Sequence, residues 1–286
     1  MSNLVLRTLS AAVLLPLAIA CFVAGGWWLK GLVLFAAAAC FFEYGSVVIK
    51  SDKLLRTLLF MLGVAGCFAG MVVNDPIIML LAIDGAFMVL ACVTVLRPGQ
   101  DLQVTFRNLA LLVFALVWVG FGVIAVVRLR DLGDVRQLDG AAKGAFILVA
   151  FTATWANDTC AYFAGRFLGK HKMAGAISPK KTWEGFIGGA IGTPIFLLIG
   201  RALYAPAWEP VSTLDMFLVS IPVALLGPVG DLTESLWKRG FDVKDSGNLI
   251  PGHGGMLDRI DAVFFVAPWT LAYFTAIKPL VDAWVA

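Results

Sequence analysis

The sequence is poor in charged residues and contains almost no histidine. Of its 286 residues, 14% are Asp, Glu, Lys or Arg, 2 are His, and 60% are hydrophobic. Soluble domains carry roughly 25% charged residues, so this composition excludes an ordinary soluble fold and indicates an integral membrane protein. The net charge of +3 comes without a dense basic run, and we therefore expect no nucleic-acid partner.

Paired cysteines and long hydrophilic stretches are also missing. The five cysteines lie in apolar segments without CxxC spacing, so the sequence indicates neither a disulfide framework nor a zinc site. Because no hydrophilic stretch is long enough for a soluble domain, we predict one membrane domain over residues 1–286. Within it, residues 1–140 would form N-terminal helices with a scaffolding or oligomer role, and residues 141–286 the catalytic core.

Long apolar segments dominate what is present. A membrane-spanning helix needs about 20 mostly apolar residues. Nine segments qualify, which predicts an all-α polytopic fold: 9–29, 31–49, 57–73, 76–96, 108–127, 144–165, 185–204, 214–236 and 260–280.

The distribution of Lys and Arg predicts the orientation. Lys and Arg are concentrated in every second connection between the apolar segments, and such connections usually lie in the cytoplasm. This predicts that the N-terminus and the loops 166–184 and 237–259 are cytoplasmic. The prediction depends on those two loops, because the remaining connections do not decide between the two orientations.

Four acidic residues interrupt the apolar segments: Glu43, Asp84, Asp158 and Asp231. A carboxylate near the bilayer centre costs about 2.5–3.5 kcal/mol on insertion scales, so each should face the bundle interior, a partner or a water-filled cavity. A buried acid hydrogen-bonded between helices remains an equal alternative for Glu43 and the favoured one for Asp84. A functional role is favoured for Asp158, which lies beside Asn157.

The end of segment 214–236 carries a polar helical face. Asp231, Glu234, Ser235 and Lys238 are spaced i, i+3, i+4 and i+7, so they share one side of a helix. Gly and Pro residues at 227–230 precede them, as expected where a broken helix lines a cavity. A solvated helix end is the alternative interpretation.

A glycine-rich loop, Pro251–Gly255, follows in the chain. Successive glycines allow main-chain N–H groups to converge on an anion, and the next helix would add its positive end. Asp258 and Asp261 follow within six residues. Together with Asp231 they supply the hard oxygen ligands that Mg²⁺ prefers, and nearby cations would neutralise phosphate charge.

A basic segment lies upstream, at 166–184. Ser178 and Pro179 are typical of an N-cap and a first helical residue, and the helix start would then present Lys180 and Lys181 to an anion. A topological or lipid-contacting role is the alternative for these lysines.

The stretch from Ser235 to Asp261 resembles the signature of the phosphatidate cytidylyltransferase (CDP-diacylglycerol synthase) family. The matching residues are Ser235, Lys238, Arg239, Lys244, Asp245, Gly247, Pro251, His253, Gly254, Gly255, Asp258, Arg259 and Asp261. Trp237 departs from the aliphatic residue or Phe usual in the family. The elements GKHK and ISPKKTWEG also look like this family, and the resemblance is strongest over 155–261.

The resemblance implies transfer of CMP from CTP to phosphatidate, giving CDP-diacylglycerol and pyrophosphate, with Mg²⁺ as cofactor. A second metal or a monovalent cation is left open. It also implies a multi-pass protein of the bacterial inner membrane, a homodimer, and contact with membrane lipids. We expect Lys238, Asp231 and Asp261 to be catalytic and Asp231, Asp258 and Asp261 to hold metal. The expected substrate-binding residues are Ser178, Lys180, Lys181, Ser235, Arg239, Lys244, His253, Gly254, Gly255 and Arg259.

Two alternatives remain. The first is the same chemistry on another lipid, an archaeal or isoprenoid phosphate, or a CTP-dependent kinase of a lipid alcohol. A transporter would also carry acids in its helices, but the sequence has no inverted repeat and its polar residues gather at one membrane face instead of the midplane.

Overall fold

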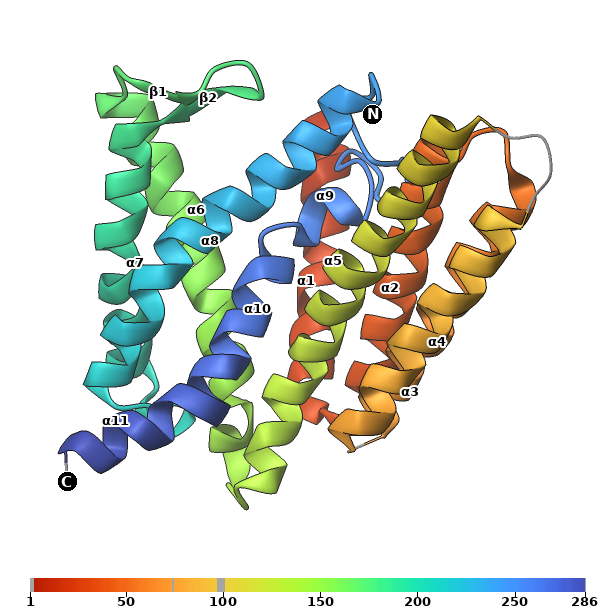
Figure 1. The fold of residues 1–286 in the computed structure, drawn as a ribbon. Coiled ribbons are helices and arrows are strands. Elements are labelled where there is room, and N and C mark those ends of the chain that lie inside the picture. The colour runs from red at the N-terminus through yellow and green to blue at the C-terminus, as the bar shows by residue number, and fades with distance from the viewer. Residues whose placement is uncertain (1–2, 74, 97–100, 286) are drawn as a thin grey trace. The chain divides into compact units, whose positions relative to one another are not determined.

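The computed structural model describes residues 3–73, 75–96 and 101–285 and is almost wholly helical (Figure 1). The elements are α1 (Asn3–Ala24), α2 (Gly26–Val48), α3 (Lys53–Val72), α4 (Pro76–Val95), α5 (Leu102–Val135), η1 (Gly140–Gly144), α6 (Ala145–Leu168), β1 (Lys172–Ala174), β2 (Ser178–Thr182), α7 (Trp183–Leu203), η2 (Ala205–Trp208), α8 (Thr213–Gly240), α9 (Leu257–Ile260), α10 (Val263–Ala272), the π-helical η3 (Tyr273–Ile277) and α11 (Lys278–Val285).

Seven helical spans within the described residues are long and apolar enough to cross a membrane, which supports an all-α, multi-pass membrane protein. Helices occupy all nine predicted apolar segments. However, α6 is not among the seven, and α4 contributes only a shorter apolar stretch, Leu80–Val95, so the predicted count of nine spans is not confirmed. The first junction lies at Gly25, where the backbone φ of 64° suits glycine, and not at residue 30, between the predicted segments 9–29 and 31–49.

The chain forms two compact units. Unit 1 comprises Met1–Val127 with Phe241–Arg259, and unit 2 comprises Arg128–Gly240 with Ile260–Ala286. The loop 241–259, which carries much of the sequence signature, therefore packs with the N-terminal helices.

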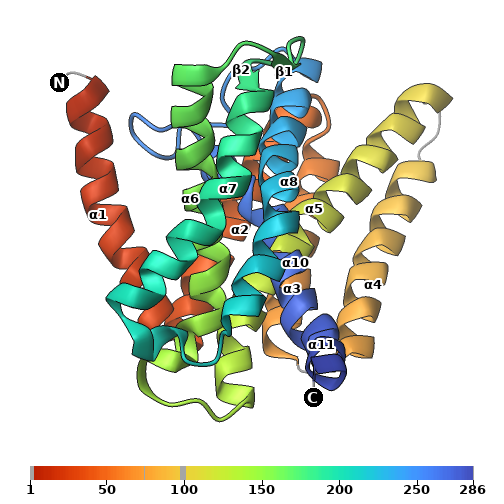
Figure 2. The ribbon, with the colours of Figure 1, turned by 90° about the vertical axis from the view of Figure 1, so that its left-hand side faces the viewer.

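In unit 1, polar residues define where the apolar helices begin. The carboxylates of Asp52 and Asp75 accept hydrogen bonds from Leu55 N and Ile77 N, at 3.0 and 2.8 Å, and so cap α3 and α4. Figure 2 shows α1 diverging from α2 toward its N-terminal end, where the loop 241–256 approaches it. Asp84 lies exposed on α4, so the favoured interpretation of a buried acid hydrogen-bonded between helices was wrong for this residue.

The loop 241–259 is anchored on the carboxylate of Glu43 in α2. Glu43 is buried, with 5% of its surface exposed. Its oxygens accept hydrogen bonds from Met256 N at 2.9 Å, Leu257 N at 3.1 Å and Ser246 Oγ at 2.8 Å. A buried carboxylate is stable only when its charge is satisfied by such donors. Glu43 therefore attaches both ends of the segment 246–257 to α2.

Two glycines of the loop make room for Glu43. A Cβ at Gly247 would lie 2.7 Å from Glu43 Oε1, and a Cβ at Gly255 would contact Glu43 Oε2 and Ser246 Oγ. Both glycines are therefore required by close approach to a side chain more than 200 residues away.

Unit 2 is organised on the antiparallel pair α6 and α7. Small residues bring the two helices together, since a Cβ at Gly188 would meet Ala164 Cβ and a Cβ at Gly192 would meet Cys160 Sγ. Such small-residue contacts are a common basis for close helix packing in membranes. The helices are joined by the hairpin β1–β2, in which Lys172 pairs with Thr182 and Ala174 with Ser178 (Figure 1).

Gly255→Ala should destabilise the protein by about 1–3 kcal/mol, because the added methyl group has no space beside Glu43. Gly66→Ala on α3 is the matched control, since nothing lies within 4 Å of its Cβ position. Thermal unfolding in detergent measures the difference. Equal unfolding midpoints for the two variants would show that Glu43 does not occupy this space.

Candidate functional site

The predicted site residues of unit 2 gather where β2 faces α8. Lys181 Nζ lies 2.9 Å from Asp231 Oδ2 and donates a hydrogen bond of 2.9 Å to the carbonyl oxygen of Pro228. The lysine side chain is 21% exposed and that of Asp231 42%. Lys181 therefore binds the proline-containing turn of α8 and the carboxylate that follows it.

The local structure that presents Lys181 differs from the prediction. Residues Ser178–Thr182 form strand β2, and the N-cap of α7 is Thr182, whose side chain accepts a hydrogen bond from Gly185 N. The expectation that Ser178 caps a helix was wrong. Pro179 is compatible with β2 because a two-stranded hairpin consists of edge strands.

Asp261 lies against the same turn of α8. A Cβ at Gly230 would come within 2.9 Å of Asp261 O and 3.0 Å of Ala262 Cα, so the absence of a side chain allows the two segments to touch. Asp261 precedes the apolar helix that begins at Val263. Burial and the neighbouring Asp231 raise its pKa to about 7.

Asp158 of α6 belongs to this group as well, because it interacts electrostatically with Asp231, Lys181 and Asp261. We call Asp158, Lys181, Asp231 and Asp261 the acidic cluster. Three carboxylates and one lysine leave an excess of negative charge, partly buried, that a hard cation would compensate.

The predicted polar face of α8 is confirmed by its contacts. Ser235 Oγ donates to Asp231 Oδ1 at 3.2 Å, and Lys238 Nζ lies 2.6 Å from Glu234 Oε2. The carboxylate of Glu234 is 2% exposed. The face thus carries two pairs of contacting side chains and is not simply a solvated helix end. Lys238 also acts electrostatically on Asp261, whereas Arg239 and Lys180 are exposed.

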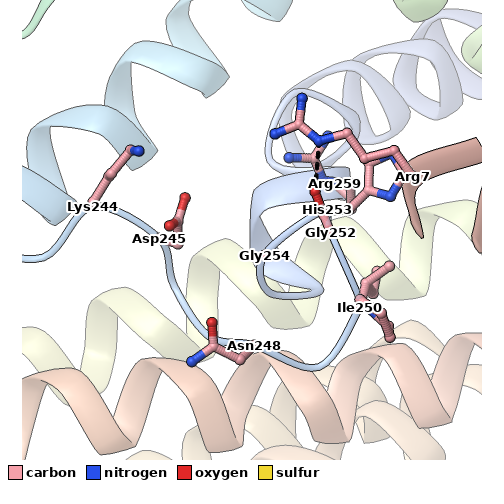
Figure 3. Close-up of a pocket in the computed structure, with 10 residues that line it drawn as sticks. Arg7, Lys244, Asp245, Asn248, Ile250, Gly252, His253, Gly254 and Arg259 are labelled. Atoms are coloured by element: carbon pink, nitrogen blue, oxygen red, sulfur yellow. Dashed lines mark hydrogen bonds between the residues drawn. The ribbon is translucent and has the colours of Figure 1, made fainter. Parts of the chain in front are cut away.

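Unit 1 contains a separate polar cavity of about 730 Å³ at the glycine-rich loop (Figure 3). It is lined by Arg7, Lys244, Asp245, Asn248, Ile250, Pro251, Gly252, His253, Gly254 and Arg259. Figure 3 shows Arg7, His253 and Arg259 grouped at one end of the cavity. Partial burial and the nearby charges of Arg259 and Arg7 lower the pKa of His253, which favours the neutral form of the imidazole.

The main-chain N–H groups at the glycine-rich loop, which we expected to bind an anion, donate hydrogen bonds within the protein. Those of Met256 and Leu257, at the start of α9, donate to Glu43, and that of His253 donates to Ile250 O at 2.9 Å. The helix start that we expected to bind a phosphate therefore binds the protein's own carboxylate. Charged side chains, those of Arg7, Lys244 and Arg259, also line this cavity and can bind an anion.

Asp258 also organises the loop. Its Oδ2 accepts hydrogen bonds from Ser246 N and Gly255 N, both at 2.9 Å, and lies 3.0 Å from Ser246 Oγ. Among the described residues, no three His, Cys, Asp or Glu side chains form a group that could by itself hold a metal ion. The contacts therefore assign Asp258 a structural role beside the predicted one.

The structure thus separates the predicted residues into two groups. Unit 1 contains Lys244, His253, Gly254, Gly255, Asp258 and Arg259; unit 2 contains Ser178, Lys180, Lys181, Asp231, Ser235, Lys238, Arg239 and Asp261.

Three further residues had no assigned site role in the sequence. Arg7 lines the cavity, Ser10 Oγ lies 2.8 Å from His253 Nδ1, and the fully buried Asn157 donates to Val223 O at 3.1 Å. Asn157 carried a signal, since a buried amide within an apolar helix needs a polar partner. Arg7 resembled an ordinary flank of a membrane helix, and Ser10 gave no signal.

Comparisons with known proteins agree on one family. The model of the cytidylyltransferase family matches residues 5–277. The phosphatidate cytidylyltransferase of Thermotoga maritima is 31% identical over 286 residues, covering 98% of this chain and 100% of that protein. That of Staphylococcus saprophyticus is 36% identical over 203 residues, covering 70% of each chain. The match to the Bacillus subtilis protein of the same name, 36% identical over 165 residues, spans 58% of each. The chain belongs to the cytidylyltransferase family.

Proposed function

We propose that this protein transfers CMP from CTP to phosphatidate, producing CDP-diacylglycerol and pyrophosphate at the membrane surface. The observation that carries the proposal is the acidic cluster, in which Lys181 and Asp231 meet at 2.9 Å beside Asp261. Family membership and the names of the relatives support the substrates.

The reaction is a single phosphoryl substitution. An oxygen of the phosphomonoester of phosphatidate attacks the α-phosphorus of CTP, and the bond from that phosphorus to the oxygen bridging to the β-phosphorus breaks. Phosphomonoesters have a second pKa of about 6, so the nucleophile is already ionised at neutral pH. A strong general base is therefore unnecessary, and positioning and charge stabilisation supply the catalysis.

The residues of unit 2 meet these requirements as follows. Lys181, fixed by Asp231 and Pro228, and Lys238, fixed by Glu234, place positive charge at defined positions. In our proposal they stabilise the charge that develops on the α-phosphate, and Ser178, Lys180, Ser235 and Arg239 bind phosphate oxygens around them.

The carboxylates fit a divalent metal. We propose that Asp231 and Asp261 bind Mg²⁺, with phosphate oxygens and water completing the coordination, as is usual for Mg²⁺ in nucleotide sites. The metal would screen the repulsion between the two anionic substrates and stabilise pyrophosphate as it leaves. Asp258 as a third ligand, and a second metal or monovalent cation, stay predictions from the sequence.

The cavity of unit 1 supplies further phosphate-binding groups. Lys244 and Arg259 line it together with His253 and Gly254, and Gly255 allows Glu43 to hold the loop. We propose that this cavity binds phosphate groups of the substrates. We also propose a bacterial inner-membrane protein with a cytoplasmic N-terminus and site, a homodimer in contact with membrane lipids, with residues 141–286 central to catalysis.

Purified protein in detergent should convert CTP and phosphatidate to CDP-diacylglycerol and pyrophosphate only when Mg²⁺ is present. Asp261→Asn should lower kcat at least about 100-fold, since even supporting partners of metal ligands contribute about 10–100-fold. Asp282→Asn, at a carboxylate that is 60% exposed on α11, is the control and should retain activity.

Acceptor lipids offered to the same preparation decide the substrate. Turnover of an isoprenoid phosphate or a lipid alcohol without turnover of phosphatidate would overturn the phosphatidate assignment while preserving CTP chemistry. Full activity of Asp261→Asn would overturn the proposed metal site.

Lys181→Met should reduce kcat by about 100-fold or more, because removing one preorganised charge donor typically costs 10²–10³-fold. Lys172→Met, at an exposed residue of strand β1, should change kcat less than about threefold, because an exposed surface charge contributes little. Initial rates at saturating CTP and phosphatidate measure both variants. Equal losses in the two would indicate a general need for basic charge in the hairpin instead of a specific role for Lys181.

A further inference from the structure

The first turns of α1 contact the glycine-rich loop directly. Arg7 Nε donates a hydrogen bond of 2.8 Å to Gly252 O, and Ser10 Oγ lies 2.8 Å from His253 Nδ1. Gly252 has a φ of 76°, and a Cβ there would lie 3.1 Å from Arg7 Cγ and 3.3 Å from Leu6 Cβ. Glycine at this position therefore permits both the loop conformation and the close approach of α1.

Arg7 lines two different spaces. One is the polar cavity of about 730 Å³ described above, and the other is a groove of about 520 Å³ along α1. The groove is formed by Arg7, Thr8, Ala11, Ala12, Leu15 and Pro16. Apart from Arg7 and Thr8, the residues that line it are apolar. Only 6% of the apolar part of α1 is buried within the chain, which leaves the groove open to lipid.

The charge of the polar cavity favours an anion. Arg7, Lys244 and Arg259 line it, against one carboxylate, that of Asp245. Arg7 and Arg259 are close enough to His253 to act on it electrostatically. A guanidinium offers five N–H donors in a rigid fork, and the bond from Nε to Gly252 O orients that fork for phosphate.

A polar anion site that is joined through one arginine to an apolar groove is complementary to a phospholipid with a terminal phosphate. We propose that Arg7 binds the phosphate of the lipid substrate and that one acyl chain of the same lipid lies along the groove from Thr8 to Pro16. The inference rests on the proposed function and adds a lipid-binding residue from the N-terminal helix.

The test measures KM separately for the two substrates in mixed micelles, with phosphatidate expressed as surface mole fraction. Arg7→Ala should raise the KM for phosphatidate at least about tenfold, the value of one charge-assisted hydrogen bond. The KM for CTP should change less than about twofold, and Arg7→Lys should recover part of the loss. The control Arg107→Ala, an exposed arginine of α5 outside the cavity, should leave both values unchanged.

Several outcomes would overturn the inference. A rise in the KM for CTP alone would assign Arg7 to the nucleotide. A fall in kcat with both KM values unchanged, or a lowered unfolding temperature with no KM effect, would reduce Arg7 to an anchor of the loop. Absence of CDP-diacylglycerol with the unaltered protein would instead contradict the proposed function, so the two failures are distinguishable.

A second variant tests the groove. Ala12→Phe fills it, whereas Ala20→Phe adds the same bulk to an exposed position of α1 outside it. Ala12→Phe should raise the KM for dioleoyl phosphatidate at least about fivefold, because overpacking an acyl-sized space is costly. It should leave the KM for dihexanoyl phosphatidate unchanged. Equal effects on the two lipids, or equal effects of the two variants, would show that no acyl chain occupies the groove.

Discussion

The arrangement of unit 1 depends on one buried carboxylate. Glu43 accepts hydrogen bonds from Met256 N, Leu257 N and Ser246 Oγ, and the two main-chain donors would otherwise have to find another partner. Because the anchor lies in α2, the glycine-rich loop is positioned by a helix more than 200 residues earlier. The anchored loop can then hold the side chains of Lys244 and Arg259 at the polar cavity.

Unit 2 also holds partly buried carboxylates, but a lysine side chain compensates their charge instead of main-chain N–H groups. A glycine at position 230 brings Asp261 against α8, and Lys181 is the cation that pairs with Asp231 there. Partly buried carboxylates of this kind are unfavourable without compensation, which is the property expected of a site that binds a cation together with phosphate groups. The chemistry we propose uses fixed charge because its two substrates are both anions.

Local sequence patterns predicted most of the fold and part of the site. Apolar length predicted the helical segments, and the i, i+3, i+4 spacing predicted the contacts of Asp231 with Ser235 and of Glu234 with Lys238. Ser178 was misplaced because Ser-Pro suits both a helix start and an edge strand. The partners of Glu43 and Arg7 were not predictable, since both contact residues more than 200 positions away, which no local periodicity encodes.

Hydrogen–deuterium exchange of the unaltered protein and of Glu43→Ala, compared over residues 245–258, tests the central claim most directly. Exchange reports the free energy of local opening, residue by residue. Our account predicts that the amides of Ser246, Gly255, Met256 and Leu257 lose protection in the variant, while those of α6 and α7 keep it. Unchanged protection of the loop in Glu43→Ala would contradict the claim that this buried carboxylate positions the glycine-rich loop and the cavity that it lines.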